Sequence, residues 1–152
     1  MMKHKFVFAT PWGMMTVEEE DGALTRLGWG GEAVGGDDSA LLRRTECELN
    51  AYLRGELRQF TLPTAPAGTP FQRSVWRELL TIPYGAVASY GRIAQLLDRP
   101  GAARAVGMAC HCNPIAIVIP CHRVVGADGT LTGYAGGLEL KRRLLELETA
   151  IG

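Results

Sequence analysis

The sequence lacks any apolar run close to the roughly 20 residues that a membrane-spanning helix requires, so we expect no transmembrane segment. Its residues 1–6 lack the apolar region of a secretory signal peptide. Only four cysteines are present, and without a secretion signal these are expected to be free thiols and not a disulfide framework. Internal repeats and low-complexity tracts are also missing. These absences together predict a folded cytoplasmic protein without a membrane partner.

Net charge is absent as well, because 16 Lys and Arg balance 16 Asp and Glu. This balance excludes a strongly basic protein that binds nucleic acid through charge alone. The charge is nonetheless uneven: residues 1–66 hold 7 basic and 10 acidic side chains, whereas residues 67–152 hold 9 and 6. The second part therefore suits a modest contact with phosphates, made from Arg73, Arg77, Arg92, Arg99, Arg104 and Arg123.

A stretch rich in proline and glycine divides the chain near Ala67 and predicts two domains, residues 1–66 and 67–152. In the first, strand-like residues 5–29 with an Asp21-Gly22 hairpin signal predict a small antiparallel sheet. Apolar residues at helical spacing predict a helix over residues 39–54, and residues 59–62 are expected to add a strand. The fold class is therefore α/β in the broad sense, with segregated strands and helices (α+β).

The second domain is predicted to be mostly helical. Thr69 followed by Pro70 is typical of a helix start, and this helix is expected to run to about Leu80. Two short helices separated by a turn predict a helix-turn-helix. The two helices of this pair are expected over residues 91–97 and 102–110. A last helix is expected over residues 138–148.

Residues 115–125 form an apolar run that contains a Pro-Cys-His-Arg motif. Its β-branched residues predict a buried strand or extended segment that delivers the thiol of Cys121 to a fixed point. Neighbouring His122 and Arg123 are expected to lower the pKa of Cys121, because positive charge favours the thiolate. The segment therefore predicts a reactive cysteine at an active-site strand.

Several motifs follow one another in a fixed order between Thr69 and Glu148. They are Phe71-Gln72-Arg73-Ser74-Val75-Trp76, Ile82-Pro83-Tyr84-Gly85, Ser89-Tyr90-Gly91, Arg104-Ala105-Val106-Gly107, Asn113-Pro114, Pro120-Cys121-His122-Arg123-Val124-Val125 and Gly133-Tyr134-Ala135-Gly136-Gly137-Leu138. With these motifs the chain resembles the O6-alkylguanine-DNA alkyltransferases, which repair DNA by direct reversal. The first 66 residues match only loosely.

The resemblance implies a ribonuclease H-like N-terminal domain and a suicide transferase, a methylated-DNA-protein-cysteine S-methyltransferase. Such a protein flips O6-alkylguanine, with O4-alkylthymine as a further candidate lesion, out of duplex DNA. It then moves the alkyl group irreversibly to the thiolate, here Cys121, once per chain. The implied partner is double-stranded DNA with an alkylated guanine, the implied state is a monomer, and no cofactor is implied.

The resemblance also implies roles for individual residues at the acceptor. Glu148 would orient His122, which would accept the thiol proton, with a water molecule between thiol and imidazole. Tyr90 would crowd the 3′ phosphate and donate its proton toward the departing guanine. Asn113 would hold the helix-turn-helix against the Cys121 segment.

Further roles concern DNA and the flipped base. Arg104 would fill the gap left in the base stack, while the small residues Ala105 and Gly107 let the helix enter the minor groove. Arg123 would tie the acceptor segment to carboxylates and contribute to the DNA-binding set. The base would be read by backbone groups of Cys121 and Val124 and the Ala135 N–H, with Tyr134 closing the pocket.

Three other interpretations compete with this one. Cys110, His111 and Cys112 invite a metal site, but adjacent ligands without a second pair lack zinc spacing, so no metal is predicted. A lesion-binding protein without transfer would resemble this chain but lack an acceptor cysteine. A cysteine hydrolase is disfavoured, because its Cys and His are usually distant in sequence.

Overall fold

The computed structural model describes residues 2–134 and 136–149. The chain forms two compact units: Met1–Ala67 with Pro114–Val118, and Gly68–Asn113 with the residues from Ile119 onward. Six residues of the expected second domain, Ala67 and Pro114–Val118, thus pack in the first unit. The division into domains at residues 66 and 67 stays a prediction, since compactness alone does not establish independent folding.

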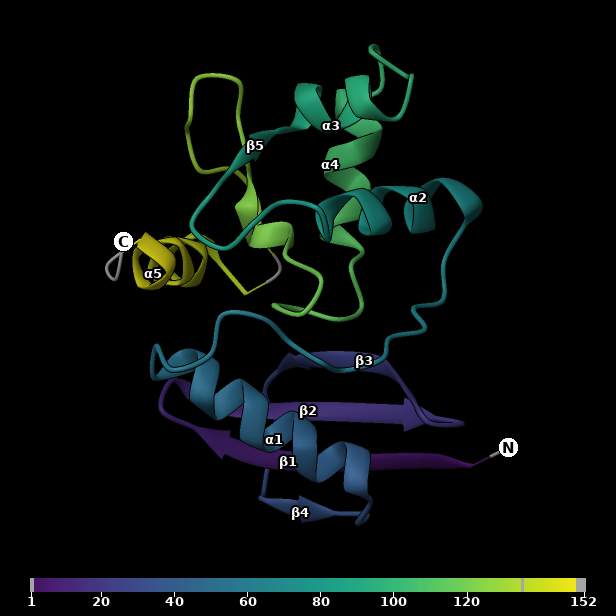
Figure 1. The fold of residues 1–152 in the computed structure, drawn as a ribbon, viewed down its shortest axis with the longest axis vertical. Helices are drawn as coiled ribbons and strands as arrows, with labels where there is room; N and C mark the ends of the chain where they lie inside the picture. Colours follow the sequence, from purple (N-terminus) through teal and green to yellow (C-terminus); the bar gives the residue numbers. More distant parts are fainter. Residues whose placement is uncertain (1, 135, 150–152) are drawn as a thin grey trace. The chain divides into compact units, whose positions relative to one another are not determined.

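The first unit is built on a four-stranded antiparallel sheet of order β3-β2-β1-β4 (Figure 1). The strands are β1 (Lys3–Thr10), β2 (Gly13–Glu20), β3 (Ala23–Trp29) and β4 (Gly35–Gly36). The expected hairpin is confirmed, because Asp21 and Gly22 join β2 to β3 with φ values of 51° and 84°. Both values lie in the left-handed region that a two-residue hairpin turn requires.

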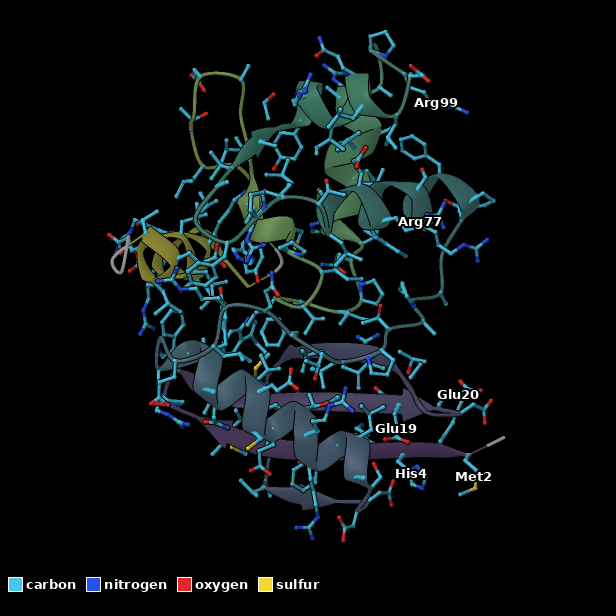
Figure 2. The ribbon with its side chains drawn as sticks, in the orientation of Figure 1. Met2, His4, Glu19, Glu20, Arg77 and Arg99 are labelled. Atoms are coloured by element: carbon cyan, nitrogen blue, oxygen red, sulfur yellow. The ribbon has the colours of Figure 1, made fainter. Side chains whose placement is uncertain are left out.

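Helix α1 (Ala40–Leu53) lies across this sheet and confirms the helix expected over residues 39–54 (Figure 1). Ser39 caps it by accepting a hydrogen bond from the Leu42 N–H. The Ser39 hydroxyl in turn donates to the buried carboxylate of Glu19, 2.6 Å away, which lies beside His4 on the neighbouring strand (Figure 2). The cap is therefore fixed to the sheet.

The strand expected over residues 59–62 is wrong. The backbone N–H of Thr61 donates to the Glu48 side chain at 2.8 Å, so it is unavailable for a ladder bond. Only Thr64 forms an isolated bridge, to Leu24, and the fourth strand is instead the two-residue β4. A side chain of α1 thus outcompetes a partner strand for this backbone donor.

The second unit contains four helices and a short parallel pair of strands within the described residues. They are α2 (Pro70–Leu79), α3 (Tyr90–Leu96), α4 (Ala103–His111), α5 (Leu138–Thr149), β5 (Ala88–Ser89) and β6 (Val124–Val125). Thr69 and Gln72 form a reciprocal capping box, which confirms the expected start of α2. Within the described ranges, no helix has the length and apolar character needed to cross a membrane.

Helices α3 and α4 form the expected pair of short helices joined by a turn (Figure 1). Asp98 adopts a φ of 59° in that turn, which ends α3. Trp76 joins α2 to α4, because its indole N–H donates a hydrogen bond to the Ala109 carbonyl at 2.8 Å. The helix pair therefore rests on a buried, hydrogen-bonded tryptophan.

The expected strand through Cys121 is largely wrong. Cys121–Arg123 form a single turn of 3-10 helix, η1, and only Val124–Val125 are extended as β6. Ile117 has a φ of 70°, and Pro120 has no N–H for a ladder. The backbone bonds locally instead, with the Cys121 N–H donating to the Ile119 carbonyl at 2.8 Å. Tight turns, and not a strand, therefore present the thiol.

Candidate active site

Asn113 and Cys121 are brought together at the start of η1. The Asn113 amide nitrogen donates to the Cys121 sulfur at 3.2 Å and to the Ile119 carbonyl at 2.9 Å. The thiol is buried, with 6% of the residue exposed. The side chain that follows α4 thus fixes both the sulfur and the backbone before it, and its N–H favours negative charge on sulfur.

The pKa of Cys121 shifts in the direction opposite to the one expected. Burial raises it above the ordinary value, while the Asn113 hydrogen bond and the positive charge of Lys141 act against that rise. The charged group that acts on the thiol is therefore Lys141, and not its sequence neighbours His122 and Arg123. Desolvation outweighs both, so the resting side chain is a thiol that needs a base.

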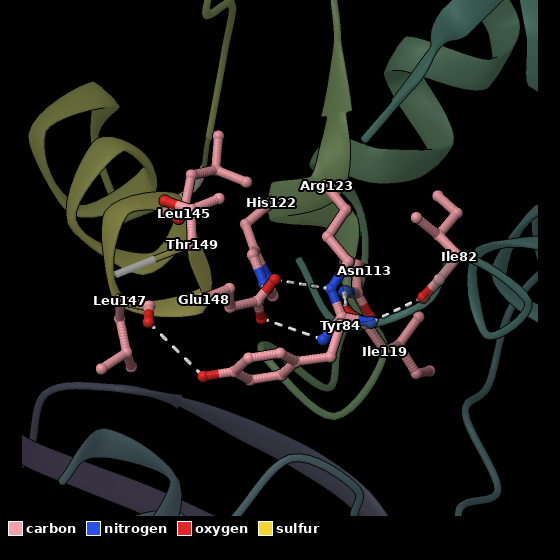
Figure 3. A network of polar contacts seen from close by, with 10 residues as sticks. All are labelled: Ile82, Tyr84, Asn113, Ile119, His122, Arg123, Leu145, Leu147, Glu148 and Thr149. Atoms are coloured by element: carbon pink, nitrogen blue, oxygen red, sulfur yellow. Dashed lines mark hydrogen bonds and ion pairs between the residues drawn. The ribbon is translucent and has the colours of Figure 1, made fainter. Parts of the chain in front are cut away.

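His122 is fully buried, and its Nε2 lies 2.8 Å from Oε2 of Glu148 (Figure 3). Burial lowers the pKa of His122 against the opposing effect of Glu148, so the ring is neutral at neutral pH. A carboxylate can only accept, so Nε2 carries the proton and Nδ1 is bare. Nδ1 has no hydrogen-bond partner in the described part of the chain. His122 is thus poised to take a proton on Nδ1.

Glu148 is buried on α5 and also binds Arg123 (Figure 3). The guanidinium donates to both carboxylate oxygens at 2.9 Å and to the Ile82 carbonyl at 2.7 Å. Arg123 is buried, and three of its N–H groups donate to Glu148 and Ile82. Its expected contact with DNA stays a prediction. Arg123 orients the carboxylate that faces His122.

Lys141 was not anticipated from the sequence, and its side chain is fully buried. Its ammonium donates to the carbonyls of Val124 at 2.6 Å and Thr132 at 2.7 Å, and lies 5.8 Å from the centre of the Tyr90 ring. A signal was present, since Lys141, Leu144 and Glu148 recur at helical spacing and form the buried side of α5. A lysine in line with a leucine on one face of a predicted helix indicates a buried lysine.

A cavity of about 410 Å³ in the second unit is lined in part by Tyr90 and Thr132, the two residues that Lys141 contacts there. The ring of Tyr90 lies there against Gly107, where an added Cβ would come within 3.7 Å of it. Arg104 and Ala105 are exposed on α4. The lining residues, of which His111 and Thr132 were not anticipated, are Tyr90, Ala103, Arg104, Gly107, His111, Thr132 and Gly133.

The other expected pocket residues are placed less completely. Val124 is buried in β6, and its carbonyl accepts from Lys141. Tyr134 is half-buried and follows Gly133 of the cavity wall. The expected backbone donor Ala135 lies outside the described residues. Their contacts with a base stay predictions.

No group of three His, Cys, Asp or Glu side chains is arranged to hold a metal ion in residues 2–134 and 136–149. Cys110 is buried and Cys112 is exposed, so their sulfurs face different surroundings. Burial and the neighbouring Cys121 raise the pKa of Cys110 to about 12. Cys110 is therefore a neutral thiol, and the expectation of no metal stays a prediction.

Replacing Lys141 with methionine is expected to shift the pH dependence of Cys121 alkylation to higher pH. The substitution removes the cation that lowers the pKa of the thiol, whereas burial remains. Burial also raises the pKa of Tyr90 and of Cys110, so neither places a negative charge near the thiol at neutral pH. The measurement is the rate of modification by iodoacetamide against pH, read by peptide mass.

The matched control is Arg142→Met, because Arg142 is the next residue but pairs with exposed Glu139 and Glu146. It should retain the pH midpoint of the unsubstituted protein. Equal midpoints for Lys141→Met and the unsubstituted protein would show that the ammonium does not act on the thiol.

Comparison with known proteins places this site in a family. The family model for the DNA-binding domain of 6-O-methylguanine DNA methyltransferase matches residues 70–150. The methylated-DNA–protein-cysteine methyltransferase of Methanosarcina acetivorans is 52% identical over 112 residues, which cover 74% of this chain and 72% of that protein. The chain belongs to this family. The O6-alkylguanine-DNA alkyltransferase resemblance is therefore confirmed.

Mycobacterial members of the methylated-DNA–protein-cysteine methyltransferase family are also similar. The Mycobacterium tuberculosis protein is 60% identical over 101 residues, but this match spans only 61% of that relative and 66% of this chain. The crystal structure of Mycobacterium tuberculosis O6-methylguanine methyltransferase superposes with a TM-score of 0.88 at 45% identity, covering 98% of this chain and 94% of that one. The fold of the family thus extends over both units, which confirms the expected fold class.

Proposed function

We propose that this protein repairs alkylated DNA by direct reversal, moving the alkyl group of O6-alkylguanine to Cys121 in a single turnover. The observation that carries the proposal is a buried thiol bound by Asn113 next to a neutral His122 whose other nitrogen is held by Glu148. Family membership supports the same reaction. A similar solved structure, the Mycobacterium tuberculosis protein in complex with DNA, supports DNA as the partner.

Transfer begins with the thiol proton. Nδ1 of His122 accepts it, directly or through a water molecule, and Glu148 stabilises the imidazolium that forms. The thiolate, held by the Asn113 N–H and the charge of Lys141, attacks the alkyl carbon. A sulfur–carbon bond forms while the carbon–O6 bond breaks, and its electron pair passes to guanine. The thioether on Cys121 is inert, so each chain acts once.

The departing guanine needs a proton, and Tyr90, whose side chain lines the cavity, can donate one. Burial raises the pKa of Tyr90, so its hydroxyl is protonated at neutral pH. Its proton neutralises the charge that develops on guanine. Tyr90 is thus the acid, and His122 is the base, of the proposed reaction.

The lesion lies inside the duplex, so the nucleotide must first be turned out at an unstacking cost of a few kcal/mol. The exposed Arg104 and Ala105 of α4, with the close approach permitted by Gly107, suit a helix in the minor groove. Arg104 would occupy the vacated place in the stack. The base would enter the cavity, and Tyr134 and the backbone of Cys121, Val124 and Ala135 would read it.

The test is intact mass after incubation with an excess of duplex carrying one O6-methylguanine. One added methyl group per chain, about 14 Da, located at Cys121 and never exceeded, is the expected result. A duplex with unmodified guanine is the control, and one with O4-methylthymine tests the second lesion. Tight lesion binding without a gain in mass would identify a lesion-binding protein instead. The monomeric state and cytoplasmic location remain predictions.

A further inference from the structure

We propose that Thr132 is a positioning residue that aims the proton of Tyr90 at the flipped base. The proposal rests on the proposed transfer reaction and adds to it a residue outside the resemblance motifs. Both side chains line the 410 Å³ cavity, Tyr90 from α3 and Thr132 from the loop after β6. They come from positions 42 residues apart, so only the tertiary structure brings them together.

The hydrogen bond between the two side chains runs from Thr132 to Tyr90. The Thr132 hydroxyl donates to the Tyr90 oxygen at 2.9 Å, which occupies an acceptor position of the phenol. The phenolic proton therefore points elsewhere. Among the described residues, the only group that accepts a hydrogen bond from the Tyr90 hydroxyl is the Thr132 carbonyl, 3.5 Å away, and this bond is long and weak. A substrate acceptor in the cavity can readily displace that contact.

Lys141 holds Thr132 in place. Its ammonium donates to the Thr132 carbonyl at 2.7 Å and to the Val124 carbonyl at 2.6 Å, which joins the loop to β6 and α5. The same ammonium lies 5.8 Å from the centre of the Tyr90 ring. Burying a lysine is costly unless polar groups surround it. The arrangement thus holds the loop and the tyrosine around one cation.

Proton donation by Tyr90 leaves a negative charge on its oxygen, beside the Thr132 hydroxyl. As the carbon–O6 bond breaks, its electron pair passes to guanine, and the proton of Tyr90 moves to guanine with the O–H electrons left on the phenolic oxygen. A donor to that oxygen stabilises the phenolate as it forms. Burial raises the pKa of Tyr90 and the Thr132 bond acts against that rise. Net transfer is complete when the phenolate regains the proton that Cys121 gave to His122.

Thr130 offers a matched control within the same loop. Its hydroxyl donates to the Asp128 carboxylate at 2.7 Å, a local turn contact two residues away, and among the described residues no hydrogen bond links it to Tyr90. Thr130→Val and Thr132→Val therefore remove the same group from the same loop. Only Thr132→Val removes a hydrogen-bond partner of Tyr90.

The experiment measures the single-turnover rate of methyl transfer from saturating O6-methylguanine duplex. Thr132→Val is expected to slow transfer about tenfold, the loss of one hydrogen bond in the transition state. Thr132→Ser, which keeps the hydroxyl, should restore the rate, and Thr130→Val should match the unsubstituted protein. Alkylation of Cys121 by iodoacetamide should be unchanged by Thr132→Val, because iodide leaves without a proton.

A double-substitution cycle separates positioning from general loosening of the loop. In a Tyr90→Phe background, Thr132→Val should have no further effect, since the oxygen it serves is gone. An equal loss in both backgrounds, an equal loss with Thr130→Val, or an unchanged rate with Thr132→Val would overturn the inference. If the unsubstituted protein transfers no methyl group, the proposed function is wrong, and the inference that rests on it is wrong as well.

Discussion

Replacing Cys121 with serine is expected to abolish methyl transfer while leaving a folded protein that binds the lesion duplex. Serine has nearly the same shape, so the pocket beside Asn113 stays filled. Its hydroxyl is far less acidic than a thiol, and burial, which already raises the pKa of Cys121, makes ionisation harder still. We expect a rate at least about 10⁴-fold lower, as when a covalent nucleophile is removed.

The measurement compares added mass and lesion binding for the two proteins under single-turnover conditions. Cys47→Ser is the control, because this exposed thiol lies on α1 in the first unit and should have no part in transfer. A methyl group found on the Cys121→Ser protein would move the acceptor to another side chain. A native circular dichroism spectrum and retained lesion binding would show that the Cys121→Ser protein is folded, so that its loss of transfer is a loss of chemistry.

Replacing Glu148 with glutamine is expected to cost both stability and rate. The carboxylate holds Arg123 by two hydrogen bonds of 2.9 Å and His122 by one of 2.8 Å, all in buried surroundings. The amide leaves the buried guanidinium without a counter-charge, which costs about 3–5 kcal/mol. It also removes the negative charge that stabilises protonated His122, so transfer should slow about 100-fold.

Urea unfolding and single-turnover transfer measure the two effects separately. The control is Glu146→Gln on the same helix, because Glu146 is exposed and pairs only with Arg142 among the described residues. It should change the free energy of unfolding by less than about 0.5 kcal/mol. Equal unfolding midpoints for both variants would contradict the claim that Glu148 is the centre of a buried network.

Local signals in the sequence were sufficient for most of the elements. The Asp21-Gly22 turn, the Thr69 cap and the break at Asp98 each act through the backbone of a few neighbouring residues, so their outcome is independent of distant parts. The strand expected over residues 59–62 was wrong because a side chain of α1 binds its backbone. The Cys121 segment was misassigned because a run of β-branched residues does not distinguish a strand from a buried turn.

The sequence by itself determined the family, the acceptor motif and the helix pair, because these depend on residue identity and short-range order. Only the tertiary structure decided how the groups at Cys121 are charged and aimed. Burial raises the pKa of a thiol whose sequence neighbours suggested the opposite. Lys141 of α5 acts on that thiol, and Thr132 of the loop after β6 donates a hydrogen bond to Tyr90 of α3. Desolvation and pairing depend on which distant residues pack around a group, and sequence spacing does not record them.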